Sequence, residues 1–190
     1  MIEMTGSALQ EYARGILTHV PWEHWLVMVV VSLALTVILL IQKKCSVYGA
    51  IVLGLTVFTC LVILDTAVVI RYLGFLRHGT GRNLELELDR LLHGSELARN
   101  EVISNVVVFV PFGFFLEEFF AATKRFGGWW RLGFVAMSAW GLSFCIEFLQ
   151  LVLRVGYFEV MDLLLNTLGG VLGAVIAIDG RALLVRGKRC

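Results

Sequence analysis

Five long apolar stretches dominate this chain and limit the folds that it can adopt. They run roughly over residues 22–41, 47–70, 102–121, 132–153 and 163–184, and each has about the 20 mostly apolar residues that an α-helix needs to cross a bilayer. A transmembrane β-barrel would instead alternate apolar and polar residues. Runs such as Leu-Val-Met-Val-Val-Val at 26–31 do not alternate. The sequence therefore predicts an all-α polytopic membrane helical bundle with about five transmembrane helices.

The composition and the first residues set the domain organisation. The chain is 58% hydrophobic and only 16% charged, which is too apolar for an ordinary soluble domain. Before the first span, apolar residues recur at a spacing that predicts a helix lying in the membrane interface. These residues are Leu9, Tyr12, Ala13, Ile16 and Leu17. We therefore expect an interfacial helix at 1–20 and a transmembrane bundle at 21–190, with no nucleic-acid partner.

Basic residues predict how the bundle is oriented. They gather after the first, third and fifth spans, at Lys43, Lys44, Lys124, Arg125 and the carboxyl-terminal tail. The opposite side carries the loop at 71–101, where arginines are mixed with acidic residues and where leucine spacing favours a helix lying on the surface. Because Lys and Arg near helix ends favour the cytoplasmic side, we expect the amino terminus outside and the carboxyl terminus in the cytoplasm.

Six polar or ionisable side chains interrupt the apolar stretches at one depth. Spans two and four end on the predicted outer side, and spans three and five begin there. The six residues are Asp65, Asn105, Glu147, Gln150, Asp162 and Asn166. Such groups are costly in hydrocarbon and normally face a protein interior or a water-filled cavity, which predicts a ligand site. The alternative is hydrogen bonding between helices that only holds the bundle together, at about 0.6–2 kcal/mol for each contact.

The two carboxylates of span four and span five are the strongest candidates for function. Glu147 and Asp162 would repel each other unless they share a proton, bind a cation or meet Arg154. Arg154 follows Glu147 and Gln150 at helical spacing and joins the candidate set. The predicted ligand-binding residues are Asn105, Glu147, Gln150, Arg154, Asp162 and Asn166. Glu147 and Asp162 are also the catalytic candidates, and the sequence assigns neither a metal site nor a cofactor.

The other acidic residues near the spans have ordinary interpretations. Asp65 is close enough to Arg71 for an interface ion pair, and Glu117 and Glu118 are expected to snorkel or to pair with nearby basic residues at the cytoplasmic end of span three. These basic residues are Lys124 and Arg125. The four histidines lie at or beyond the ends of the spans, at His19, His24, His78 and His93. A histidine base inside the hydrocarbon is therefore not expected, whereas one that enters from the outer loop is not excluded.

Three sequence blocks together resemble the VanZ-like membrane proteins, a family named for a glycopeptide-resistance accessory protein. They are Asn-Val-Val-Val-Phe-Val-Pro-Phe-Gly at 105–113, Glu-Phe-Leu-Gln at 147–150 and a block at 162–173 that opens with Asp-Leu-Leu-Leu-Asn. The resemblance covers about residues 71–180. It implies a bacterial plasma-membrane protein, in some members tied to tolerance of teicoplanin-like lipoglycopeptides. Members often open the last helix with an Asp-x-Asp-Asp cluster, whereas this chain has Glu159-Val-Met-Asp162.

Three functions fit these observations. The favoured hypothesis is an outer-leaflet polar pocket that binds a lipid headgroup or a lipid-linked envelope precursor. The second is an enzyme that hydrolyses or transfers such a headgroup, with the carboxylates as general acid and base. A small transporter is less favoured, because the inner half of the bundle has few polar groups. The spacing Gly169-x-x-x-Gly173 permits close helix approach, within one subunit or across a homo-oligomer.

Overall fold

The computed structural model describes residues 20–43, 45–70, 72, 96–124, 127–156 and 158–187. Its helices are α2 (Trp22–Ile41), α3 (Val47–Leu64), the π-helix η1 (Asp65–Val69), α6 (Glu96–Thr123), α7 (Gly128–Val152) and α8 (Val160–Gly187). Five helices in these ranges are long and apolar enough to cross a membrane, and the same ranges contain no strand. The predicted all-α bundle is thus confirmed. The interfacial helix expected at 1–20 and the surface helix expected in the 71–101 loop fall on residues outside the described ranges.

The helices begin and end close to the positions expected from hydropathy, with one exception. The third membrane helix, α6, starts at Glu96, although its apolar part begins only at Ile103. Its first turns therefore extend beyond the apolar segment and contain charged residues. Pro111 lies inside this helix, which is continuous from Glu96 to Thr123.

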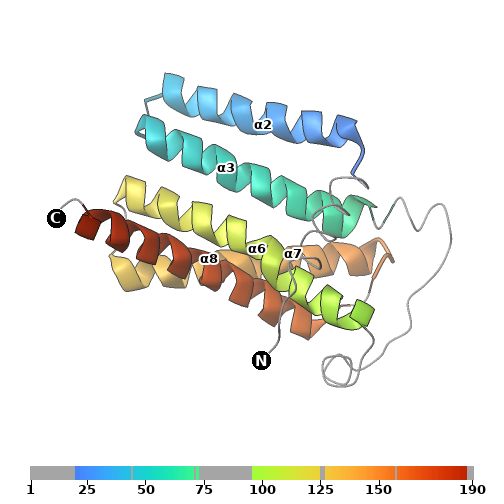
Figure 1. Cartoon of the computed structure of the whole chain (residues 1–190). Helices are drawn as coiled ribbons and strands as arrows, with labels where there is room; N and C mark the ends of the chain where they lie inside the picture. Colours follow the sequence, from blue (N-terminus) through green and yellow to red (C-terminus); the bar gives the residue numbers. More distant parts are fainter. Residues whose placement is uncertain are drawn as a thin grey trace.

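The helices pack in a simple order that places α6 and α8 at the centre (Figure 1). α2 packs on α3, α3 on α6, and α6 on α8, while α7 contacts both α8 and α6. α2 lies at the edge, and only Met28 and Ser32 of this helix are buried. Because successive membrane helices run in opposite directions, the bundle has two ends. We call one the Asp65 end, where η1 and α7 end and α2, α6 and α8 begin, and the other the Glu117 end.

Glycines bring the backbones of α6 and α8 into direct contact. A Cβ atom on Gly169 would overlap the carbonyl oxygen of Val106, and one on Gly173 would overlap that of Val110. On α6, a Cβ on Gly113 would overlap the carbonyl oxygen of Gly170. Only glycine permits such an approach of two helices. The Gly169-x-x-x-Gly173 motif is therefore used within the chain, for packing α8 against α6.

An apolar core lies between the two ends of the bundle. It is formed by buried side chains of α3, η1, α6, α7 and α8 and separates the polar groups of one end from those of the other. Its members are Ile63, Val68, Phe109, Phe112, Leu116, Val135, Ala139, Ile146 and Ala174. Burial of such side chains from water is the main favourable term in folding of soluble domains, whereas in lipid their close packing supplies the attraction between helices.

Candidate functional site at the Asp65 end

Polar contacts link α2, α3 and α7 at the Asp65 end. His24 lies in the first turn of α2, and its Nδ1 is 2.8 Å from Oδ1 of Asp65, the first residue of η1. Gln150, near the end of α7, donates a hydrogen bond from Nε2 to the carbonyl oxygen of Ala67 at 3.0 Å. The accepting carbonyl belongs to η1, so the π-helix is held from both sides.

Two further contacts continue this series to the remaining helices. Asn166 of α8 donates from Nδ2 to Ser143 Oγ of α7 at 2.9 Å, and both side chains are buried. Asn105 of α6 donates from Nδ2 to Asp162 Oδ1 of α8 at 2.5 Å. Together these four contacts, which we call the polar relay, connect all five membrane helices at one end. Every one of the six residues of the predicted polar layer except Glu147 takes part in it.

Glu147 makes a different contact, with the chain that leads into α8. Its side chain is buried, with the residue only 1% exposed, and its Oε2 accepts a hydrogen bond from the backbone N–H of Glu159 at 2.8 Å. α8 begins at Val160, and Asp162 lies in its first turn. The amino terminus of a helix carries partial positive charge and favours nearby carboxylates. Glu147 and Asp162 therefore both lie near the start of α8, at the same end of the bundle.

Arg154 does not continue the helical face of Glu147 and Gln150, contrary to the sequence analysis. α7 ends at Val152, and Arg154 lies beyond it in an exposed turn with a φ of 58°. The turn folds back on the helix: a Cβ on Gly156 would lie only 2.8 Å from Oε1 of Gln150. The helical period ceases to apply where the chain turns, and the binding role of Arg154 stays a prediction.

Asp65 has a partner that the sequence analysis did not name. Its Oδ1 contacts His24, and the predicted ion pair with Arg71 falls on a residue outside the described ranges and stays a prediction. The carboxylate sits at the start of a π-helix, a rare element that is frequent at functional sites. Two buried acceptor oxygens of this end, Asp65 Oδ2 and Asn166 Oδ1, have no hydrogen-bond partner among the residues that the structure describes. The sequence analysis did not predict this pair, although the shared depth of His24 and Asp65 in consecutive antiparallel helices could have indicated it.

Metal binding is not indicated by the described residues. No group of three or more His, Cys, Asp and Glu side chains in these ranges is placed to hold a metal ion. A bridging cation between Glu147 and Asp162 therefore has no support from a preformed ligand set.

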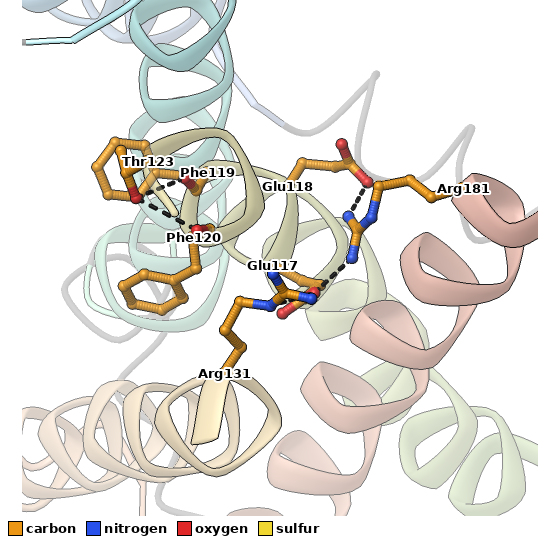
Figure 2. Close-up of polar contacts among 7 residues, drawn as sticks. All are labelled: Glu117, Glu118, Phe119, Phe120, Thr123, Arg131 and Arg181. Carbon is orange, nitrogen blue, oxygen red and sulfur yellow. Dashed lines mark hydrogen bonds and ion pairs between the residues drawn. The ribbon is translucent and has the colours of Figure 1, made fainter. Parts of the chain in front are cut away.

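A second polar cluster lies at the Glu117 end, where sequence analysis expected only surface pairs (Figure 2). Glu117 is fully buried, and its Oε1 is 2.5 Å from Nη2 of Arg181 on α8. Nη1 of the same arginine donates to Glu118, whose other oxygen accepts from the hydroxyl of Tyr48 on α3. Nε of Arg131 on α7 is 3.1 Å from Glu117 Oε1, and the two groups form an ion pair without hydrogen-bond geometry.

This cluster corrects two expectations. The partners of Glu117 and Glu118 are arginines on α7 and α8, because those helices pack against α6. Lys124, which was expected as a partner, is exposed. The half of the bundle at the Glu117 end also contains more polar groups than the sequence analysis expected. Glu117 and Arg181 lie near the ends of span three and span five on the same side of the bundle, and this shared depth could have predicted their pairing.

Similarity to known proteins agrees with this architecture. The family model described as VanZ/LLP1 matches residues 25–185, which reach from α2 into α8 and extend beyond the region at 71–180 that carried the resemblance. Protein VanZ of Enterococcus faecium is 36% identical to this chain over 73 residues, which are 38% of this chain and 41% of that protein. The chain thus aligns with less than half of this relative, and no solved structure matches it. Since the family match includes parts of all five membrane helices, the chain belongs to the VanZ/LLP1 family.

Proposed function

We propose that this membrane protein binds the headgroup of a lipid, or of a lipid-linked envelope precursor, at its Asp65 end, and that this end faces the outer leaflet of a bacterial plasma membrane. The observation that carries the proposal is the polar relay, which gathers polar side chains from all five membrane helices at one end. The orientation is supported by Lys43, Lys124 and Arg181, which lie at the Glu117 end.

The chemistry of the relay favours a ligand that is rich in hydrogen-bond donors. Asp65 Oδ2 and Asn166 Oδ1 are buried acceptors that receive no hydrogen bond from the described part of the chain, and a buried polar atom left without a partner costs about 1–3 kcal/mol. Sugar hydroxyls and headgroup ammonium groups are donors of this kind. The carboxylates of Glu147 and Asp162 accept from the same groups, with stronger hydrogen bonds because they carry charge.

One observation favours the enzyme as a second candidate. A carboxylate that accepts from Nδ1 of a histidine fixes the ring and leaves Nε2 able to take a proton. His24 and Asp65 have this arrangement, and the imidazole remains partly exposed. A headgroup hydrolase or transferase would use Nε2 of His24 as the base. A transporter is less favoured, because the apolar core separates the two polar ends.

Mass spectrometry of lipids that copurify with the protein tests the binding proposal. Glu147→Gln and Asp162→Asn keep the shape of each side chain and remove its charge, so we expect folded proteins that lose the bound lipid. Asp179→Asn is the matched control, since Asp179 is an exposed carboxylate near the Glu117 end of α8. Retention of the same lipid by both site variants would contradict the proposal. A chemically altered headgroup that disappears in His24→Gln would instead favour the enzyme.

A link to drug tolerance follows if the lipid ligand affects the outer surface of the membrane. Lipoglycopeptides carry an acyl tail that anchors them in the outer leaflet, and each buried methylene contributes about 0.8 kcal/mol. We therefore expect expression in a susceptible Gram-positive host to raise tolerance of a lipidated drug more than that of its analogue without the tail. The effect should vanish in the Glu147→Gln/Asp162→Asn variant. Equal changes for both drugs would exclude this mechanism.

A further inference from the structure

An apolar groove lies between α2 and α3, apart from both polar ends. Its volume is about 290 Å³, and its walls include Val29, Leu33 and Thr36 of α2 and Ile51, Leu55 and Phe58 of α3. Several of these side chains are accessible from outside the bundle, with Leu33 59% and Ile51 47% exposed. The groove therefore opens sideways, toward the surroundings of the two helices.

The polar atoms of the groove are already used by its own helix. Ser32 Oγ donates to the carbonyl oxygen of Met28, and Thr36 Oγ1 donates to that of Ser32, both at 2.8 Å. The remaining wall is hydrocarbon and the aromatic side chain of Phe58. An occupant of this groove must accordingly be apolar where it contacts the helices. α2 and α3 both have the length and composition of membrane helices, so the surrounding medium at this depth is lipid chains.

The groove lies between the same two helices that carry the His24–Asp65 contact at the Asp65 end. Trp25 and Phe58 pack with their ring centroids 6.2 Å apart at the end of the groove nearer to that contact, and His24 and Asp65 lie farther along the two helices toward the Asp65 end. With a helical rise of 1.5 Å per residue, Val29 and Thr36 lie about 8 and 18 Å along α2 from His24. One leaflet has a hydrocarbon depth of about 15 Å. The groove thus extends to the depth that the end of a fatty-acyl chain reaches.

We propose that this groove binds one fatty-acyl chain of the lipid whose headgroup is held at the Asp65 end. The inference rests on the proposed function and specifies its ligand as an acyl lipid of the same leaflet. A single unbranched chain fits this groove, which runs between two helices and lies within one leaflet and the midplane. A polyprenyl chain is longer and carries a methyl branch in every unit, so it would not fit within this depth.

Photocrosslinking in lipid nanodiscs tests this assignment. A phospholipid with a diazirine in the distal half of one acyl chain is irradiated with the wild-type protein, and the labelled peptides are mapped by mass spectrometry. We expect labelling of α2 and α3 within 29–36 and 51–58. Val29→Phe should fill the groove and reduce this labelling about tenfold, because several methylene contacts are lost. Val30→Phe is the control, since Val30 is 55% exposed and lies outside the groove.

Leu55→Phe fills the groove from α3 and is a second filling variant in case Val29→Phe does not fold. Thermal unfolding of both variants identifies a folding defect in either protein. Equal labelling in the filling variants and in Val30→Phe would overturn the proposal. So would preferential labelling by a polyprenyl probe, or crosslinks between two copies of the chain. If Val29→Phe retains the bound lipid while Glu147→Gln loses it, the groove assignment alone fails. If only Val29→Phe loses the lipid, the acyl site stands and the headgroup site fails.

Discussion

The two polar ends of the bundle differ in the way that buried charge is accommodated. At the Glu117 end, two carboxylates meet two guanidinium groups, and all four come from membrane helices. At the Asp65 end, the relay consists of hydrogen bonds in which two carboxylates, an imidazole, three amides, a hydroxyl and a backbone carbonyl take part. Opposite charges that neutralise each other suit a scaffold, whereas the acceptors left without donors on Asp65 and Asn166 suit a site that takes a ligand.

The helices also differ in how firmly they are held to neighbouring helices. Arg181 bridges Glu117 and Glu118, so one side chain of α8 holds two side chains of α6 (Figure 2). The glycine contacts of α6 and α8 lie between this bridge and the Asn105–Asp162 hydrogen bond. The α6–α8 pair is thus fixed at both ends and in the middle. α2, by contrast, has few buried residues, and its polar tie is the contact of His24 with Asp65.

The largest effect expected from this comparison is an all-or-none difference in accessibility. In a variant without its four cysteines, a cysteine introduced at Arg154 should react with a membrane-impermeant thiol reagent in intact cells. One at Lys124 should react only after permeabilisation. Both positions are exposed in the structure, so burial does not confound the readout. Labelling of the Lys124 position alone in intact cells would reverse the assignment of the two ends while keeping them on opposite sides.

The Glu117 end should make the largest contribution to stability. Arg181→Ala leaves the carboxylate of Glu117, which is fully buried, with Arg131 alone. Breaking a buried ion pair by removing one partner costs about 3–5 kcal/mol, and we expect a loss of this order in reversible unfolding in detergent. Adding Glu117→Gln to Arg181→Ala should recover part of the loss, because the uncompensated charge is removed. A loss as small as that of the exposed-site control Lys124→Ala would contradict the scaffold role.

The close backbone contact of α6 and α8 at their glycines should be destabilised by a single added methyl group. Gly173→Ala places a Cβ against the backbone of α6 at Val110, where no side chain can rotate away. Overpacking of this kind costs about 1–3 kcal/mol, so we expect reduced thermal stability. Gly141→Ala is the control on α7, since no atom lies within 4 Å of the added Cβ. Unchanged stability of Gly173→Ala would show that α6 and α8 can separate without loss.

The sequence predicted those parts of the structure that depend on one helix at a time. Hydropathy located the five spans, and the positions of Asn105, Gln150 and Asn166 within them gave the correct end of the bundle. Partners across helices depend on lateral order, which an apolar pattern does not encode. The pairing of Glu117 with Arg181 was missed for this reason, although both lie at the same predicted depth.

Local backbone geometry set the other limit. The helical period placed Arg154 on the face of Glu147, but α7 ends two residues earlier and the chain turns through a positive φ. Likewise, residues 65–69 form a π-helix instead of continuing α3 as an α-helix, and the run of apolar residues around them carries no sign of this change.

The smallest effect expected concerns the relay itself and tests whether it is only a scaffold. The Nδ2 group of Asn166 donates to the fully buried Ser143 Oγ, and a double-mutant cycle of Ser143→Ala and Asn166→Leu measures the energy of this contact. Hydrogen bonds between membrane helices average about 0.6 kcal/mol and reach about 1.7 kcal/mol. A coupling near the average means that the contact adds little to folding, so the burial of Asn166 with an unpartnered Oδ1 requires another reason. Added lipid then supplies the decisive measurement: it should stabilise the wild type more than Asn166→Leu. A coupling well above the range, with equal stabilisation of both proteins by lipid, would make this part of the Asp65 end a scaffold like the Glu117 end.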